Sequence, residues 1–415
     1  MQAGVGTADA IGGATPEIDG TVRAVNGLTA RWAEATTGGT VHSAAGVWPL
    51  LAFLADGATG PARTELARAV GLPAGQSAAA ARELLAALRT VPGLGAALGL
   101  WTRHTLPLRE EWRAGLPAEA HGVLGDDPEA TGRALDTWVA ERTGGLIGRM
   151  PVALTPDTVL VLASALALRT DWQRPFDERM LQPDAGPWRG RTLLGLHRRS
   201  IRLDRIGATD TPAGYVTRLT VPGDNGIDVH LLLGEERMTP GQVLGAGINL
   251  LGGAHRPVSG ALLPHGNAGP GLRVEQEPCT TPQPPLLDVT TVAYEVTAHH
   301  DLAALHQLFG LSAATDPGQG HFPGISDAPL ALGSARQSVV ARFGALGFRA
   351  AAATAVAAVP GGGPPQYRHT TTVVRATFDR PFGFLAVHRH TRLALVAGWV
   401  TDPTPYAHSA AYGPG

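Results

Sequence analysis

The chain has 415 residues, 44% of them hydrophobic, and a formal net charge of −2. It is therefore long enough to bury a large core, and no excess of charge points to nucleic acid or to an anionic membrane as a partner. All 33 basic residues are arginine, beside 54 glycines and 33 prolines. We interpret this bias as the mark of a GC-rich, bacterial coding sequence. The single cysteine, Cys279, excludes a disulfide within the chain.

Residues 1–20 have neither the basic start nor the apolar stretch of a signal peptide. We expect a disordered lead-in there and, with no signal visible, a cytoplasmic protein. No apolar run in the sequence is long enough to span a bilayer, which predicts no membrane association through a helix.

The first part of the chain has helical patterns and the last part has strand patterns. An amphipathic helix is predicted at 21–36, and a buried apolar segment follows at 44–58. Three further helices are predicted, at 61–72, 77–90 and 128–145.

The apolar run at 157–172 fits either a long buried strand or a helix, because its periodicity does not discriminate. Residues 255–286 are rich in proline and glycine and give no clear pattern. The other predicted elements are strands at 214–221, 227–234 and 286–298, a helix at 301–311, and strands at 370–378, 382–390 and 392–400.

This order predicts an α+β fold. Because no linker separates two cores, we expect one domain over 21–403 and a flexible tail over 404–415.

The sequence contains no arrangement of residues typical of an enzyme. The common serine-hydrolase, phosphate-binding and zinc-protease motifs are absent. Residues 93–99 are rich in glycine but lack the spacing of a nucleotide loop. Cys279 has no base near it in sequence, so we do not expect a catalytic thiol. The sequence predicts neither an enzyme nor a cofactor.

Two histidine groups raise the question of a metal site. His299, His300 and His306 lie close together in sequence, and His388 and His390 alternate along a predicted strand. Either group can supply metal ligands, but histidines at a strand–helix junction and on a solvated strand face explain the two patterns better. We therefore predict no metal site.

Residues 349–366, "RAAAATAVAAVPGGGPPQ", form the most unusual segment. An alanine run favours a helix, but three glycines and two prolines end it, and predicted strands follow. Apart from Arg349 the segment carries no charge.

The chain also contains a series of segments, in order, that resemble the serpin family. Residues 378–403 resemble its C-terminal signature, whose most specific positions are Asp379, Arg380, Pro381 and Phe382. Residues 161–177 are similar to the central strand of the family's large sheet and to the aromatic residues after it. Three more segments follow family patterns: "GVWPLLAFLADGATGPARTEL", "LDTWVAERTGGLI" and "FPGISDAPLAL".

This resemblance implies three β-sheets, eight or nine helices and an exposed reactive-centre loop at about 345–365. It also implies a monomeric inhibitor that acts as a suicide substrate. A serine protease cleaves the loop and is trapped as an acyl-enzyme while the loop inserts into the large sheet as a new strand. Such a loop needs small side chains, because they fit a close-packed sheet.

The resemblance assigns the loop residues as follows. Gly347 matches the hinge glycine, and family spacing places the cleaved bond between Gly361 and Gly362. Cleavage after Ala358 or Val359 would suit an elastase- or subtilisin-like protease better. The hinge residues are Ala345, Gly347, Phe348, Ala350, Ala351, Ala352, Ala353 and Thr354.

Several residues depart from the family pattern. Ala345 stands where inhibitors carry glutamate, and Phe348 where they carry a small residue. An oversized ring that enters a packed sheet costs about 1–3 kcal/mol, so Phe348→Thr is expected to raise the fraction of protease trapped. In the region where the sheet must open, Ser43 keeps the family residue, whereas Ser164 and Gln337 replace asparagine and histidine.

Two hypotheses follow. The first is an inhibitor of a serine protease. The second is a non-inhibitory serpin-fold protein, either a binding protein or a mere protease substrate, which Ala345 and Phe348 favour. The family resemblance also allows an extracellular location.

Overall fold

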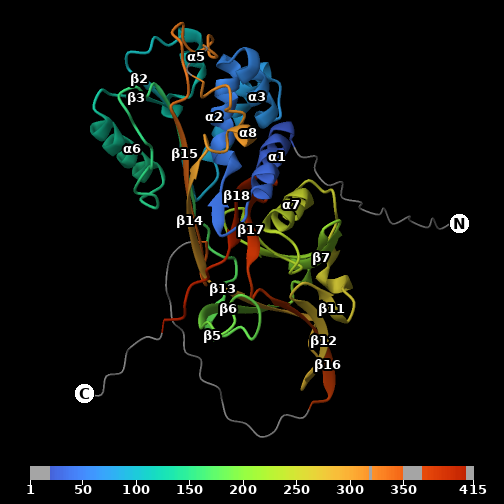
Figure 1. Ribbon diagram of the computed structural model, residues 1–415. Coiled ribbons are helices and arrows are strands. Elements are labelled where there is room, and N and C mark those ends of the chain that lie inside the picture. Colours follow the sequence, from blue (N-terminus) through green and yellow to red (C-terminus); the bar gives the residue numbers. More distant parts are fainter. Residues whose placement is uncertain (1–18, 317–319, 349–366, 408–415) are drawn as a thin grey trace, which may run out of the picture.

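The computed structural model describes residues 19–316, 320–348 and 367–407. Its described residues form eight α-helices and three β-sheets, which confirms the predicted α+β class (Figure 1). The helices are α1 (Gly20–Glu34), α2 (Ala44–Gly57), α3 (Gly60–Val70), α4 (Ala74–Arg89), α5 (Glu110–Gly115), α6 (Pro128–Arg142), α7 (Pro240–Leu251) and α8 (His306–Phe309).

One sheet has five strands in the order β14-β15-β4-β2-β3, and its neighbours β15 and β4 are parallel. Its strands are β14 (Tyr294–Asp301), β15 (Ser334–Phe343), β4 (Leu160–Leu168), β2 (Leu94–Arg103) and β3 (His121–Leu124). Every residue of β4 is buried, which settles the apolar run at 157–172 as a strand rather than a helix.

A second sheet has seven strands in the order β1-β18-β17-β9-β8-β7-β10. They are β1 (Thr40–His42), β18 (Ala394–Val400), β17 (Phe382–His388), β9 (Ile227–Gly234), β8 (Gly214–Pro222), β7 (Ile206–Thr211) and β10 (Val258–Ser259).

The third sheet has six strands in the order β11-β12-β16-β13-β6-β5. They are β11 (Gly266–Gly269), β12 (Leu272–Cys279), β16 (His369–Thr377), β13 (Leu286–Val292), β6 (Leu193–Ser200) and β5 (Asp177–Leu181).

The two faces of the five-stranded sheet meet different neighbours. Leu162 and Leu166 on β4 point into the large core that also contains most of α2. The alternate residues Ala163 and Ala165 pack with Leu135 of α6. This alternation follows from the two-residue period of a strand. In Figure 1, α6 lies on one side of this sheet and α1 and α2 lie on the other.

Two predictions about elements were wrong, and one region without a predicted element contains strands. The predicted strand 286–298 is two strands in different sheets, β13 and β14, which are separated at Ala293. The predicted helix 301–311 is mostly turns, with the four-residue α8 inside it. The unclear region 255–286 contains β10, β11 and β12. Residues 93–99, the glycine-rich stretch, form most of β2.

The expected tail begins with residues bonded to the body of the protein. The Thr404 amide donates to the Ala293 carbonyl (2.8 Å), and the Tyr406 amide donates to the Thr192 carbonyl (3.0 Å). Residues 408–415 and the expected lead-in up to residue 18 lie outside the described residues.

Candidate functional site: the hinge and the opening of the sheet

The chain that leaves β15 turns back immediately. The Gly344 amide donates to the Gly347 carbonyl (3.0 Å), which closes the turn. The Phe348 amide then donates to the Thr170 carbonyl (2.7 Å), and Gly347 forms an antiparallel bridge with Asp171. The first residues of the hinge are therefore already paired with the residues that follow β4.

This pair lies on the side of β4 that faces β15. On the opposite side of the same segment, the Arg169 amide donates to the Gly93 carbonyl (2.8 Å), which continues the β2–β4 pairing. Only the β15 side is left for the returning hinge. The hinge thus points into the line along which β15 and β4 meet.

Gly347 is required by this close approach. A Cβ atom at this position would lie 2.3 Å from the Thr170 carbonyl oxygen and 3.0 Å from the Asp171 Cα. Real Cβ atoms do not come so near to backbone atoms, so any side chain here would force the two segments apart. The residue assigned to the hinge by resemblance is therefore one that the backbone geometry also demands.

Ala345 and Phe348 are both buried in the intact protein, with 3% and 0% of their surfaces exposed. The Phe348 ring lies 6.2 Å from the Phe384 ring of β17, between ring centres. The predicted cost of overpacking at Phe348 depended on the assumption that its ring enters the core only when the loop inserts. That assumption was wrong, because the ring is inside before any cleavage.

The burial of Ala345 also bears on the missing glutamate. The Ala345 carbonyl accepts from the Phe176 amide (2.9 Å), and its methyl group belongs to the main core. A glutamate there would bring a carboxylate into an apolar environment, which is costly without a partner. Alanine is therefore the residue that this surrounding favours.

Ser43, Ser164 and Gln337 meet in one buried network. The Gln337 side chain donates from Nε2 to the Ser43 carbonyl (2.8 Å) and to Ser164 Oγ (3.1 Å), and its Oε1 accepts from the Ser43 amide (2.9 Å). Ser164 Oγ donates to the Gly46 carbonyl (2.8 Å). At most 1% of the surface of any of the three named side chains is exposed.

The network joins the neighbouring strands β15 and β4. Gln337 on β15 lies directly beside Ser164 on β4, and both are tied to the N-terminus of α2. A Cβ on Gly46 would lie 2.9 Å from Ser164 Oγ, so glycine allows the helix to come this close. Ser164 and Gln337 both depart from the family pattern, and they form a hydrogen bond with each other.

The four signature residues have structural roles. Asp379, Arg380 and Pro381 connect β16 with β17, and the Arg380 guanidinium donates to the Gly234 carbonyl (2.7 Å). Phe382 is fully buried and lies edge-on to the Trp188 ring. These residues hold two sheets together.

The remaining candidate residues are dispersed. His299 bonds Ser338 and His306 bonds Ser312, while His300 bonds a backbone carbonyl. His388 bonds Thr391, and Cys279 is a buried free thiol at the end of β12. Within the described ranges, no three histidine, cysteine, aspartate or glutamate side chains are grouped so as to hold a metal ion.

No helix in the described part of the chain is both long and apolar enough to cross a membrane.

The hinge residues after Phe348 and the residues of the candidate cleavage sites lie outside the described residues. They are Ala350, Ala351, Ala352, Ala353, Thr354, Ala358, Val359, Gly361 and Gly362. Their predicted roles therefore stay predictions.

Comparison with known proteins agrees with the fold. The family model "Serpin (serine protease inhibitor)" matches residues 24–185. Serpin-Z6A of Oryza sativa subsp. japonica is 30% identical over 157 residues, which span 35% of this chain and 40% of that protein. Alpha-1-antitrypsin 1-2 of Mus musculus is 23% identical over 320 residues, which span 74% of this chain and 67% of that protein.

Solved structures extend the likeness to nearly the whole chain. Human thyroxine-binding globulin superposes with a TM-score of 0.67 at 17% identity, covering 92% of this chain and 98% of that one. The thermophilic serpin Tengpin, in its native state, gives a TM-score of 0.68 at 15% identity, covering 94% and 96%.

The fold is that of the serpins, and the sequence matches support the serpin family for this chain. The alignments to the rice proteins span only about 40% of their length.

Proposed function

We propose that this protein inhibits a serine protease as a suicide substrate, by inserting its cleaved loop between β15 and β4. The observation that carries the proposal is the antiparallel pair of Gly347 and Asp171 at the end of this strand pair. A strand that enters between β15 and β4 must run antiparallel to both, and the hinge already runs that way. Insertion would lengthen a strand pairing that already exists between Gly347 and Asp171, so the pairing would not have to be started anew.

The register of this pair defines where each loop residue would go. Because Gly347 faces Asp171, residue 350 would face Leu168 and residue 352 would face Leu166. Even-numbered loop residues would then share the face of β4 that points into the main core. Odd-numbered residues would share the face covered by α6. Alanine suits both faces, since larger side chains would overpack them.

The same register places Thr354 beside Ser164. Opening the sheet separates Ser164 from Gln337 and leaves the hydrogen bond between them unmade. A threonine hydroxyl that arrives between the two can accept from Gln337 and donate to Ser164, since a hydroxyl does both. The polar network would thus be rebuilt around the inserted strand and leave no buried group unpaired.

The loop resemblance assigns the target chemistry. The protease serine would bond to the carbonyl carbon of Gly361 as the peptide bond to Gly362 breaks and releases its amino group. Cleavage after Ala358 or Val359 would fit an elastase- or subtilisin-like pocket. The proposed inhibitor is a monomer that needs no cofactor.

The experiment is incubation with a panel of serine proteases, followed by denaturing electrophoresis. We expect a complex that survives SDS with at least one elastase- or subtilisin-like protease. A protease whose catalytic serine is replaced by alanine should form none. Ala352→Glu is the matched variant of the inhibitor, because it keeps the loop but buries a charge on insertion; it should be cleaved without forming a complex.

The alternative is a non-inhibitory protein of the same fold. The buried Ala345 and Phe348 favour it, because a hinge anchored in the core resists being pulled further along the sheet. In that case every protease that cleaves the loop would leave as free enzyme. Cleavage by the whole panel without any stable complex would establish this alternative.

A further inference from the structure

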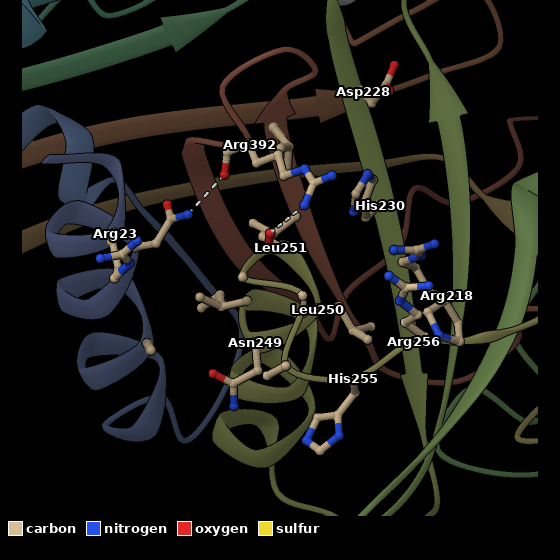
Figure 2. Close-up of a pocket in the computed structure, with 18 of the residues that line it drawn as sticks. Arg23, Arg218, Asp228, His230, Asn249, Leu250, Leu251, His255, Arg256 and Arg392 are labelled. Atoms are coloured by element: carbon tan, nitrogen blue, oxygen red, sulfur yellow. Dashed lines mark hydrogen bonds between the residues drawn. The ribbon is translucent and has the colours of Figure 1, made fainter. Parts of the chain in front are cut away.

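A hairpin covers the strand to which the far end of the loop is attached. This strand, β16, lies inside the six-stranded sheet, between β12 and β13. The hairpin β11–β12 belongs to the segment after α7. His255 and Arg256 lead from the end of α7 across to Arg218 of β8 (Figure 2), β10 then pairs with β7, and the hairpin follows. Without this hairpin β16 would be the edge strand of its sheet.

Main-chain pairing holds β16 from both sides. On one side the whole of β12, Leu272–Cys279, pairs with it in antiparallel register. On the other side β13 runs parallel to β16 and pairs with residues 373–377. Residues 369–372, which are nearest to the loop, therefore have the hairpin as their strand partner.

The buried side chains of the three strands pack in one row. Val274 of β12 lies opposite Val374 of β16, which in turn lies opposite Leu287 of β13. At most 3% of the surface of each residue is exposed, and all three belong to the main core. Removal of β16 would leave a gap in this row, which destabilises a packed core.

Ion pairs join the same strands on the opposite face. The Arg375 guanidinium of β16 pairs with Glu275 (3.1 Å) and Glu277 of β12 and with Asp288 of β13 (3.7 Å). The Asp288 side chain is 7% exposed, and its carboxylate also lies 2.8 Å from Nε2 of His197 on β6. One guanidinium thus connects β16 to both of its neighbours.

The length of the loop gives this pairing a consequence. In the register proposed above, residue 358 would face Leu160, so the inserted loop would run along all nine residues of β4, about 30 Å. Residues 359–368 would have to return to β16, and ten residues reach at most about 35 Å. In Figure 1, β16 lies below the lower ends of β14 and β15, so the return path is longer than β4 itself. Full insertion of an uncut loop would therefore put β16 under tension, and release of β16 would add its nine residues to the path.

We propose that the β11–β12 hairpin is a clamp that keeps β16 in its sheet, so that the loop inserts only after a protease has cut it. This inference rests on the proposed function, because it presupposes that the cut loop inserts between β15 and β4. A cut between Gly361 and Gly362 separates the inserting residues from β16, so the clamp does not oppose their insertion. The intact protein would keep its loop available until a protease arrives.

The test is a conversion experiment on the full, uncut chain. The unmodified protein and its variants are held just below their melting temperatures, and samples taken over time are treated with elastase as a probe of the loop. A chain that has inserted its uncut loop resists elastase, melts at a higher temperature and still runs as one band in denaturing electrophoresis. We expect little conversion of the unmodified chain.

Arg375→Met removes the three ion pairs but keeps a long side chain. It should convert about tenfold faster, a change of about 1.4 kcal/mol in the barrier. Arg273→Met is the matched control, since Arg273 lies opposite Arg375 but pairs with Glu275 of its own strand (2.7 Å); it should convert no faster than the unmodified chain. Gly271→Ala is a second variant without a change of charge. Its Cβ would lie 2.2 Å from the Thr377 carbonyl oxygen, which would push the hairpin away from β16 and should also speed conversion.

Three results would overturn the clamp. They are conversion of the unmodified chain as fast as Arg375→Met, absence of conversion in both Arg375→Met and Gly271→Ala, and equal acceleration in Arg273→Met, which would indicate a general loss of stability. If Arg375→Met does not melt cooperatively, Gly271→Ala decides alone.

The cut protein separates these results from a failure of the proposed function. If the cut chain melts higher than the intact chain and neither variant converts, only the clamp is wrong. If the cut leaves the melting temperature unchanged, the loop does not insert, and the proposed function and the clamp are both wrong.

Discussion

Replacing Phe348 by threonine distinguishes a ring that is buried from the start from one that enters with the loop. In the structure the ring is fully buried and lies near Phe384 before any cleavage. If it stays there while the rest of the loop inserts, the intact and the cleaved protein both lose its packing. The threonine variant should then be less stable in both forms, and the difference between the two forms should stay unchanged.

The magnitude follows from the cost of a cavity. Truncating a buried phenylalanine costs about 3–5 kcal/mol of the free energy of unfolding. An unfolding entropy of about 2.1 cal/mol/K per residue amounts to roughly 0.9 kcal/mol/K for 415 residues. The melting temperature should therefore fall by about 3–6 °C in each form. Trapping should not improve, because no ring has to be admitted during insertion.

The assay is thermal denaturation of intact and loop-cleaved protein for Phe348→Thr and for Tyr367→Ala. Tyr367 is 58% exposed on the far side of the loop, so its variant is the control and should melt like the unmodified chain. An intact Phe348→Thr that keeps its melting temperature and traps more protease would refute the reasoning. It would restore the sequence-based expectation that the ring obstructs insertion.

Four further predictions concern the hinge, the opening of the sheet, the inserted strand and acid stability. Gly347→Ala should cost about 1–3 kcal/mol and speed proteolysis of the loop, because its Cβ would meet a backbone carbonyl. Gln337→Leu should destabilise the intact protein by about 1–3 kcal/mol in denaturant melts, because buried groups of Ser43 and Ser164 lose their hydrogen-bond partner. The control Gln276→Leu removes an exposed hydrogen bond and should leave stability unchanged. Ala352→Glu should abolish the gain in stability on cleavage, because a buried unpaired charge costs several kcal/mol. Burial and a neighbouring histidine lower the pKa of His42 to about 3. The unfolded chain takes up this proton below about pH 6.5, so His42 alone should make stability fall by roughly 1.4 kcal/mol per pH unit from there toward pH 3, and His42→Leu should remove that share of the slope while the share of the buried His230 remains.

Each of these predictions has an outcome that contradicts it. An alanine at 347 with unchanged loop proteolysis would mean that the hinge pair is not needed. Equal losses of stability in Gln337→Leu and Gln276→Leu would show that the buried network contributes no more to stability than an exposed hydrogen bond does. A glutamate at 352 that leaves the cleaved form as stable as before would exclude the proposed register. An unchanged acid profile in His42→Leu would assign the acid sensitivity to other groups.

The sequence predicts best where local pattern and packing agree. The alternation of leucine with alanine in β4 follows the two faces that meet α2 and α6. The signature at 379–382 was recognisable because it joins two sheets through a buried phenylalanine and a guanidinium that bonds a distant carbonyl. Such residues are constrained by many neighbours at once.

It predicts poorly where distant segments decide the outcome. Ala293 separates two strands that belong to different sheets, and nothing in the run 286–298 marks the division. The strands β10, β11 and β12 are defined by the strands that they pair with, and the first two are only two and four residues long. Local propensity carries no information about such partners.

The candidate site shows the same contrast between what local sequence determines and what distant segments determine. Gly347 was assigned to a hinge by resemblance, but its need for glycine depends on a carbonyl of Thr170, which is far away in sequence. The complementarity of Gln337 and Ser164 was also invisible, because each departs from the family pattern in a different segment. Pairs of departures that lie on neighbouring strands are the signal that could have found this network.

The most direct test of loop insertion is the melting temperature of the protein before and after a single cut in the loop. The account predicts that a cut after Gly361, with both fragments still associated, raises the melting temperature markedly, because the alanine run gains main-chain hydrogen bonds on both sides and buries its small side chains. Equal melting temperatures for the intact and the cut protein would contradict the account and leave the chain a serpin in fold without the insertion mechanism.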